Sequence, residues 1–580
     1  MKLRLKNMVC ALLLILPLSL LLTCAQQTDP AKMKIQQLLA EGKTSLGLAN
    51  YDDAIKSFQL ILDQYDPENP DAMYGVAIAS TVRQLAGMGD QFKSIIDMVF
   101  QMLPTLTTAP QTPMKLTPQA SASGVNAIME SVINDAFLDS LDAIFPYWDK
   151  LKQHPEFSMT IDKLPAQIGV APYLVYKVDL GGVQDIGTVY FISGLARLVK
   201  SLMYIVYSMN FDVTASLPGL VQQFLPILQG KQALTVDRDF ILGLVAYIID
   251  SSPGFMTLEP NMGKQRLSDA ADLLALAIQD LLSCVDSISA EKGDQSTHLV
   301  GYRSEGNKSY LVFNLKDESG NAESIPIEFS DQIKTSLNNL ISSIQATGGG
   351  VRASWAGDLA PFVGLIVQAA LQSGMLDPVL SFAMPMLQTY IGSDTVAMIN
   401  QLMGTVKSLA KSGVISGAIT TVIPDAIQFD FGKFMHDPPQ QYLRLILPAT
   451  VKDTSVNPPT YKLLAEYECD DSTLAANSLW CPYPWGITST AHFIGTTYEI
   501  PDDGVKNTLP YLSSQDPSLG GLIYLNLSSL DSSFANEWKQ PTSFEFNYFL
   551  AKVVGGLLGG LGNLTSFPGT PAVMRKPTGN

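Results

Sequence analysis

The sequence predicts a mainly α-helical protein that also contains β-structure, so the expected fold class is α+β overall. Apolar residues recur with a period near 3.6, the spacing of an amphipathic helix, in segment 35–62 and through much of segment 120–427. Strand-like patterns are confined to a stretch near 299–329 and to parts of segment 428–580. With 47% apolar and 16% charged residues, the chain has enough apolar surface to fold.

Length and charge narrow the class of protein. Because hydrophobic cores stop growing at about 250 to 300 residues, a chain of 580 residues is expected to form several domains. Acidic residues outnumber basic residues by 54 to 37, which gives a net charge of −17. Such a chain repels phosphate backbones and contains no long run of Lys and Arg, so we expect no nucleic-acid partner.

The first element is a secretory signal, expected over residues 1–24. A basic leader precedes an almost unbroken apolar run, Met8 to Leu22, which is too short to span a bilayer comfortably. The run ends in Leu21-Leu22-Thr23-Cys24, which resembles the lipobox of bacterial lipoproteins. The resemblance implies cleavage before Cys24 and lipid attachment to it, whereas ordinary cleavage after Ala25 would release a soluble exported protein.

A lipid anchor implies a location in the cell envelope. We expect a lipoprotein of the outer membrane that faces the periplasm or the cell surface, with residues 25–34 as a short tether. An oxidising compartment allows Cys469 and Cys481 to form a disulfide, although two free thiols remain the alternative. Cys284 lies in a helical pattern and is expected to be a buried structural thiol.

The next element, residues 35–103, is expected to be a pair of helical repeats. Two periodic stretches between Ile35 and Leu62 flank a turn at 49–52, which predicts two antiparallel helices. Small residues would let these helices approach closely while an aromatic ring fills the groove between repeats. Residue 77 follows residue 42 by 35 positions, near the period of about 34 of one repeat family. The packing residues are Gly42, Ala54, Phe58 and Ala77.

These residues resemble the tetratricopeptide repeat (TPR). The resemblance implies a surface that presents grooves to protein segments, whereas a simple spacer between the membrane and the main domain remains the alternative. Because fewer than three repeats are rarely stable alone, we expect the repeat segment to pack against the following helical domain.

A linker rich in Thr and Pro, residues 104–119, separates the repeats from a helical body, residues 120–427. Within the body, two strand-like runs near 299–329 flank a polar turn and predict a β-hairpin, which we expect to be a surface excursion between helices. The last part, residues 428–580, is rich in loops and contains some strands. The helical stretches are Val125–Phe145, Val189–Met209, Leu217–Leu228, Phe240–Ile249, Leu267–Ile288, Asp331–Ile344 and Leu359–Ala410.

No catalytic, cofactor or metal motif is found in the sequence. The four histidines are scattered, and no HExxH, GxSxG or GxxxxGK pattern occurs. The strongest remaining pair is His436-Asp437, but adjacent residues in extended chain point in opposite directions, so a turn is the preferred interpretation. We therefore expect no enzyme and no cofactor.

The leading hypothesis is a non-enzymatic envelope lipoprotein that binds other envelope proteins or peptides through its TPR-like repeats and helical body. The alternative is a carrier of an apolar or lipid-like ligand inside the body, where Met and aromatic residues are frequent. The sequence leaves open the identity of the partner and the oligomeric state.

Overall fold

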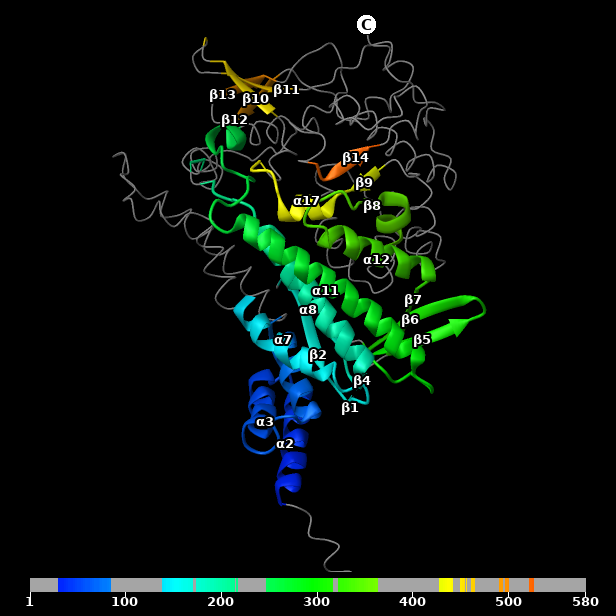
Figure 1. Ribbon diagram of the computed structural model, residues 1–580. Coiled ribbons are helices and arrows are strands. Elements are labelled where there is room, and N and C mark those ends of the chain that lie inside the picture. Colours follow the sequence, from blue (N-terminus) through cyan, green and yellow to red (C-terminus); the bar gives the residue numbers. More distant parts are fainter. Residues whose placement is uncertain are drawn as a thin grey trace, which may run out of the picture.

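The chain is mainly helical in the part that the structure describes (Figure 1). Of these residues, 57% are helical and 17% lie in strands of small sheets, which confirms the mainly α class. The computed structural model describes residues 30–84, 138–170, 174–213, 215–216, 247–316, 322–362, 427–441, 449–453, 455, 460–464, 490–493, 496–499 and 521–525.

Two antiparallel helices, α2 (Pro30–Gly47) and α3 (Tyr51–Gln64), form a hairpin at one end of the molecule (Figure 1). Ala49 in the turn between them has a φ of 57°, in the left-handed region that tight turns use. A third helical segment, residues 70–84, follows. Two helices were expected between residues 35 and 62, and the structure has both.

The centre of the body is an antiparallel pair of long helices, α8 (Ile186–Tyr207) and α11 (Gly263–Ala290). Gly187 at the start of α8 lies against Ile288 near the end of α11. At the opposite end of the pair, Arg266 Nη1 donates a hydrogen bond of 3.1 Å to the carbonyl oxygen of Tyr207. The helical patterns expected at 189–209 and 267–288 correspond to these two helices.

Small residues at seven-residue intervals allow α8 and α11 to approach closely. A Cβ atom added to Gly194 would lie 3.1 Å from the carbonyl oxygen of Ala277, so a larger residue there would push the helices apart. Ser201 Oγ donates a hydrogen bond of 2.7 Å to the carbonyl oxygen of Ala270 across the same interface. The two series are Gly187, Gly194 and Ser201 in α8 with Ser208 directly after it, and Gly263, Ala270, Ala277 and Cys284 in α11.

Both helices are also long and apolar enough to cross a membrane, judged by length and composition alone. However, α8 carries Arg197 and Lys200, which are buried and paired with acidic residues, and α11 carries the buried Asp280. Charged residues are rare within membrane-spanning helices, and the core helices of soluble proteins pass the same test of length and composition. We therefore interpret α8 and α11 as core helices of a folded body.

One flank of the helix pair is covered by α7 (Asp139–Leu151), followed by four strands that the sequence did not predict. The strands are β1 (Ser158–Ile161), β2 (Pro165–Val170), β3 (Leu174–Asp179) and β4 (Gly182–Asp185). β1 pairs with β4, and β2 pairs with β3, both antiparallel. The buried carboxylate of Asp179 accepts N–H bonds of 2.7 Å from Leu164 and 2.9 Å from Gly181, which closes the turn after β3.

The predicted hairpin is present as β6 (Lys308–Lys316) and β7 (Ala322–Glu328), paired from Tyr310–Glu328 to Lys316–Ala322. It is not an isolated surface excursion, however. A further strand, β5 (Val300–Glu305), pairs with β6, and Asp179 at the end of β3 pairs with Lys316. The hairpin therefore belongs to a five-stranded sheet with strands more than 100 residues earlier in the chain, a long-range pairing that local patterns do not reveal.

The far side of α11 is covered by α12 (Asp331–Gln345) and by a short helix, α17 (Phe431–His436). The helix α12 was expected, whereas α17 was not, because six residues are too few for a periodic pattern. A three-stranded sheet of β8 (Ala353–Ser354), β9 (Ile427–Phe429) and β14 (Ile523–Leu525) lies beside them, with the π-helix η2 (Trp355–Leu359).

The remaining strands form a separate four-stranded sheet at the other end of the molecule (Figure 1). They are β10 (Ala449–Asp453), β11 (Thr460–Leu464), β12 (Thr490–Phe493) and β13 (Thr496–Glu499). Several expectations lie outside the described residues: the signal peptide, the linker at 104–119, the helix at 217–228 and most of the helix at 359–410.

Candidate functional site: the junction of the helical hairpin with the body

The ring of Phe58 fills the centre of the N-terminal helical segment. A Cβ atom added to Gly42 would lie 2.5 Å from this ring, and one added to Gly75 would lie 2.4 Å from it. Real Cβ atoms essentially never approach to less than 3.0 Å, so only glycine fits at either position without movement of the ring. Phe58, Ala54 and Ala77 are all fully buried. The structure thus brings together Gly42 and Phe58, and it adds Gly75, to which the sequence assigned no packing role.

The helical segment 70–84 is the core of the junction. All side chains from residue 72 to residue 82 are buried, including the polar Ser80 and Thr81. A helix that is buried on every face has protein on all sides. The hairpin is therefore joined to the body through a shared core rather than through a flexible connection.

Tyr74 crosses from this segment into the body. Its ring centroid lies 5.7 Å from that of Trp148 in α7 and 5.1 Å from that of Phe157. Its hydroxyl donates a buried hydrogen bond of 2.7 Å to Gln184 Oε1 in β4. Burial, and secondarily the charge of Asp185, raise the pKa of the Tyr74 hydroxyl, so the group stays protonated and remains a donor.

Polar contacts at the rim fix the hairpin further. Tyr51 at the start of α3 donates a hydrogen bond from its hydroxyl to the carbonyl oxygen of Pro165 in β2. Tyr147 in α7 donates one of 3.1 Å to Gln59 Oε1. An exposed ion pair of 3.5 Å joins Lys150 Nζ to a Glu68 carboxylate oxygen. These contacts connect the hairpin to both α7 and the β2–β3 strands.

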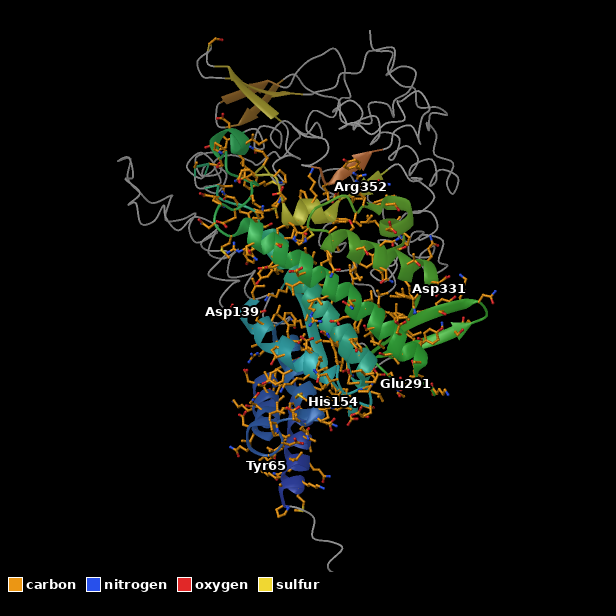
Figure 2. All side chains as sticks on the ribbon, viewed as in Figure 1. Tyr65, Asp139, His154, Glu291, Asp331 and Arg352 are labelled. Carbon is orange, nitrogen blue, oxygen red and sulfur yellow. The ribbon has the colours of Figure 1, made fainter. Side chains whose placement is uncertain are left out.

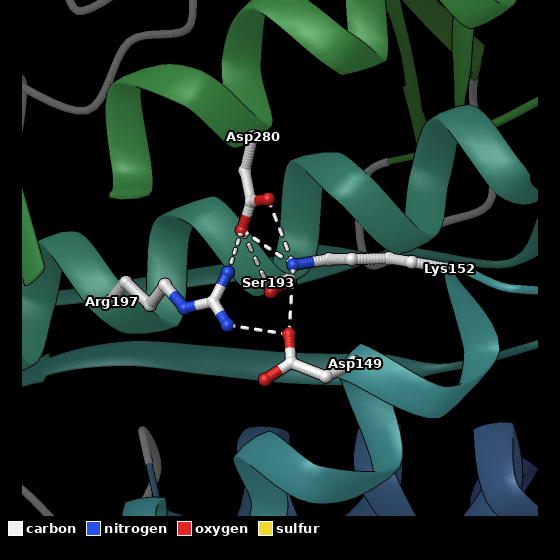
Figure 3. A network of polar contacts seen from close by, with 5 residues as sticks. All are labelled: Asp149, Lys152, Ser193, Arg197 and Asp280. Carbon is white, nitrogen blue, oxygen red and sulfur yellow. Dashed lines mark hydrogen bonds and ion pairs between the residues drawn. The ribbon is translucent and has the colours of Figure 1, made fainter. Parts of the chain in front are cut away.

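A charged network then connects α7 to α8 and α11 (Figure 3). Asp280 in α11 is its centre: Lys152 Nζ lies 2.8 Å from both of its carboxylate oxygens, and Ser193 Oγ donates to Oδ2 at 2.9 Å. Arg197 in α8 bridges two carboxylates, with Nη1 on Asp280 and Nη2 on Asp149. We call these five residues the Asp280 cluster.

The charges of this region are matched. One turn further along α8, the buried ammonium of Lys200 pairs with Asp142 of α7 and lies over the ring of Phe145. Three cations therefore meet three carboxylates between α7, α8 and α11. The cations are Lys152, Arg197 and Lys200, and the carboxylates are Asp142, Asp149 and Asp280. Such a set is a structural clamp, because each buried charge has a partner.

A second cluster lies at the other end of the helix pair, where α8 begins and α11 ends. His298 Nδ1 lies 2.7 Å from Asp185 Oδ2 and 3.6 Å from Glu291 Oε2. One nitrogen or oxygen atom from each residue lies within 4.8 Å of the others. We call these three residues the Asp185 cluster. Asp185 and His298 are largely buried, and Glu291, labelled at the end of α11 in Figure 2, reaches solvent.

Burial and the charge of Asp185 raise the pKa of the Glu291 carboxyl, while His298 lowers it by a smaller amount. The sequence did not suggest this cluster, because Asp185 and His298 are 113 residues apart. A spacing motif detects ligands on one helix or one loop, whereas these residues come from three segments.

The pair His436-Asp437 does not form an acid–base couple. His436 lies with Nδ1 2.9 Å from Ser268 Oγ and Nε2 3.1 Å from the carbonyl oxygen of Ile344. Asp437 instead binds Lys264 at 2.9 Å, and this contact lowers the pKa of its carboxyl. The two neighbouring side chains thus have separate partners. The predicted turn was wrong for His436, which is the last residue of the helix α17, and Asp437 follows as the C-cap residue.

Of the cysteines named in the sequence, Cys284 is a free, fully buried thiol. Burial is the main cause that raises the pKa of this thiol, which makes it a poor nucleophile. Cys24, Cys469 and Cys481 lie outside the described residues.

No known family model, curated protein sequence or solved structure matches the chain. The junction and the two charged clusters are the features of the described structure that bear on function. The junction can transmit position and strain between the hairpin and the body, and the Asp280 cluster can hold α7 in place.

Proposed function

We propose that this chain is a non-enzymatic envelope lipoprotein, anchored through Cys24, in which the TPR-like hairpin and the helical body act as one protein-binding scaffold. The observation that carries the proposal is the burial of residues 72–82 on every face. A hairpin that served only as a spacer would need a connection to the body but no shared core. The continuous core supports a rigid unit, which holds partners at a defined distance from the membrane.

The proposed anchor places limits on that distance. Five residues lie between Cys24 and Pro30, where α2 begins, so the first helix starts at most about 20 Å from the lipidated residue. The open end of the hairpin, where Tyr65 is labelled in Figure 2, would then face the membrane. The turn between α2 and α3 lies at the opposite end, with Gly47 close to Lys163 of the body. The hairpin would thus stand between the bilayer and the body.

The anchor is tested by the variant Cys24→Ser. We expect this change to move the mature protein from the membrane fraction to the soluble fraction, because the acyl chains would be lost. The protein should keep its circular dichroism spectrum, since residue 24 precedes the first described helix. Continued detergent-sensitive membrane association of the variant would refute lipid anchoring.

The scaffold role is tested on the exposed surface of the hairpin. Leu48 is 67% exposed, and a charged residue there leaves the core unchanged. We expect Leu48→Lys to reduce the amount of partner recovered by crosslinking in intact cells. The matched comparison is Leu202→Lys, because Leu202 is 51% exposed on α8 and shows whether the body also contributes to binding. Full recovery of the partner with Leu48→Lys would show that the hairpin is not a binding surface.

The shared core is tested by Ala54→Leu. Ala54 is fully buried in α3, so a larger side chain overpacks the hairpin and is expected to cost about 1 to 3 kcal/mol. If hairpin and body are one unit, the whole N-terminal half should melt together at a lower temperature. A separate, early transition of the hairpin alone would indicate an independent spacer.

A further inference from the structure

The Asp185 cluster is held in place by backbone structure on three sides. Asp185 ends β4 and caps α8, accepting the N–H of Thr188 on Oδ1 at 2.8 Å. Glu291 directly follows the last residue of α11. His298 is aligned with Val183 of β4 by two backbone hydrogen bonds, of 2.9 Å and 3.1 Å, that flank it. The three side chains therefore converge without depending on a flexible loop tip.

The charge of the cluster is unbalanced. Two carboxylates lie beside one imidazole, and within the described part of the chain no lysine or arginine pairs with either carboxylate. A buried carboxylate without a cation is costly, as the matched Asp280 cluster illustrates by contrast. The site thus favours an added positive charge.

A separate observation beside the cluster also indicates a polar ligand. The hydroxyl of Thr188, next to the capped end of α8, is fully buried and has no hydrogen-bond partner in the described structure. A buried hydroxyl without a partner costs free energy, and the backbone N–H of the same residue binds Asp185 Oδ1, which places Thr188 beside the cluster. The carbonyl end of α11 attracts a cation, whereas the N–H end of α8 would repel one. Asp185 Oδ1 caps the N–H end of α8 and so offsets this repulsion.

We propose that Asp185, Glu291 and His298 bind one divalent transition-metal ion of the zinc class. Zinc binds imidazole nitrogen and carboxylate oxygen at about 2.0 to 2.2 Å, which separates neighbouring ligand atoms by about 3 to 3.5 Å. The observed separations from His298 Nδ1 of 2.7 Å and 3.6 Å lie on either side of this range. On binding, Nδ1 gives up any proton to solvent, and Asp185 Oδ2, Glu291 and Nδ1 become ligands.

The ligand set selects the kind of metal. Ca²⁺ and Mg²⁺ prefer sites made of oxygen atoms alone, whereas an imidazole nitrogen suits zinc and its neighbours. Three protein ligands leave one position for water, on the side where Glu291 is 39% exposed. An ion bound there would join the start of α8 to the end of α11 and to the segment before β5. This inference does not depend on the proposed scaffold function.

The test is isothermal titration of ZnCl₂ into the full chain, purified in detergent and freed of metal with EDTA. We expect the wild type to bind one equivalent of Zn²⁺ more than His298→Gln. Glu291→Gln should weaken that equivalent by at least about 10-fold, since loss of a group that only supports a metal ligand already costs about 10- to 100-fold. Zn²⁺ should also raise the melting temperature of the wild type but not that of His298→Gln. In parallel titrations with MgCl₂ and CaCl₂, the wild type and His298→Gln should give the same result.

The matched control is His154→Gln. His154 Nδ1 also lies 3.6 Å from a carboxylate, that of Glu156, but these side chains are 29% and 76% exposed, and no third ligand joins them within the described residues. The control should therefore bind Zn²⁺ like the wild type. Because Glu291 is partly exposed, Glu291→Gln is expected to fold even if His298→Gln does not. The proposal is overturned if Glu291→Gln binds Zn²⁺ with wild-type stoichiometry and affinity, or if the wild type binds none.

Discussion

The two charged clusters of the α8–α11 pair differ in how their charges are balanced. Around Asp280, and including its neighbour Lys200, three carboxylates meet three cations. Around Asp185, two carboxylates meet one imidazole. The two central carboxylates are equally buried, with side chains 8% exposed for Asp280 and 7% exposed for Asp185. Burial therefore does not distinguish the clusters, and the difference lies in the partners.

The comparison indicates which buried charges serve stability and which are available to a ligand. A matched set satisfies each of its members, so an added ion would only disturb it. An unmatched set leaves a net negative charge that a cation would neutralise. Variants of the two clusters, together with one of an exposed ion pair, test this distinction.

The largest effect is expected from Asp280→Asn, which removes the central charge of the matched cluster. Lys152 and Arg197 would then keep only Asp149, whose side chain is 52% exposed, while their own side chains remain only 13% and 7% exposed. Breaking a buried set in this way typically costs about 3 to 5 kcal/mol of unfolding free energy. Denaturant unfolding followed by circular dichroism would measure the loss. A loss below about 1 kcal/mol, the value of an exposed ion pair, would show that the cluster is not a clamp.

A smaller effect is expected from Ser193→Ala in the same cluster. The variant loses one hydrogen bond of 2.9 Å to the Asp280 carboxylate, but Lys152 and Arg197 still bind it. We expect a loss of about 1 to 2 kcal/mol by the same unfolding measurement. In the double variant with Asp280→Asn, the two losses should not add, because both act on one contact. Full additivity would mean that Ser193 acts elsewhere.

Glu291→Gln tests the unmatched cluster through its pH dependence in the metal-free protein. The folded chain raises the pKa of Glu291 above its ordinary value of 4.5, so the folded state holds this proton more tightly than the unfolded state. The associated stability is present below the ordinary pKa and is lost as the pH rises through the raised value. The wild type should therefore show this loss in melting temperature, and the variant should not. If the melting temperatures of the two proteins changed in parallel with pH, the raised pKa of Glu291 would be contradicted.

The smallest effect is expected from Glu68→Gln at the rim of the junction. Its ion pair with Lys150 is exposed, with side chains 70% and 52% accessible, so water already screens both charges. We expect a change of less than about 1 kcal/mol, reduced further by added salt. A loss comparable to that of Asp280→Asn would mean that exposure is a poor guide to the weight of an ion pair in this protein.

Patterns within short segments allowed several elements to be predicted from the sequence. The helix α12 and the hairpin β6–β7 follow from periods near 3.6 and 2 over at least seven residues. The strands between residues 158 and 185 were missed because two of them have only four residues and contain polar or glycine positions. Their pairing with each other and with β6 provides the stability that their own composition does not.

The sequence by itself determined where the longer described helices form and which small residues can lie at close contacts, because these depend on local period and side-chain size. Gly42 and Phe58 were recognised in this way, and their contact in the structure has the size match that the pattern implied. Only the tertiary structure decided which charges meet. Asp185 reaches His298, and Asp280 reaches Lys152, across 113 and 128 residues of chain. Electrostatic partners depend on distance in space, which sequence separation does not encode.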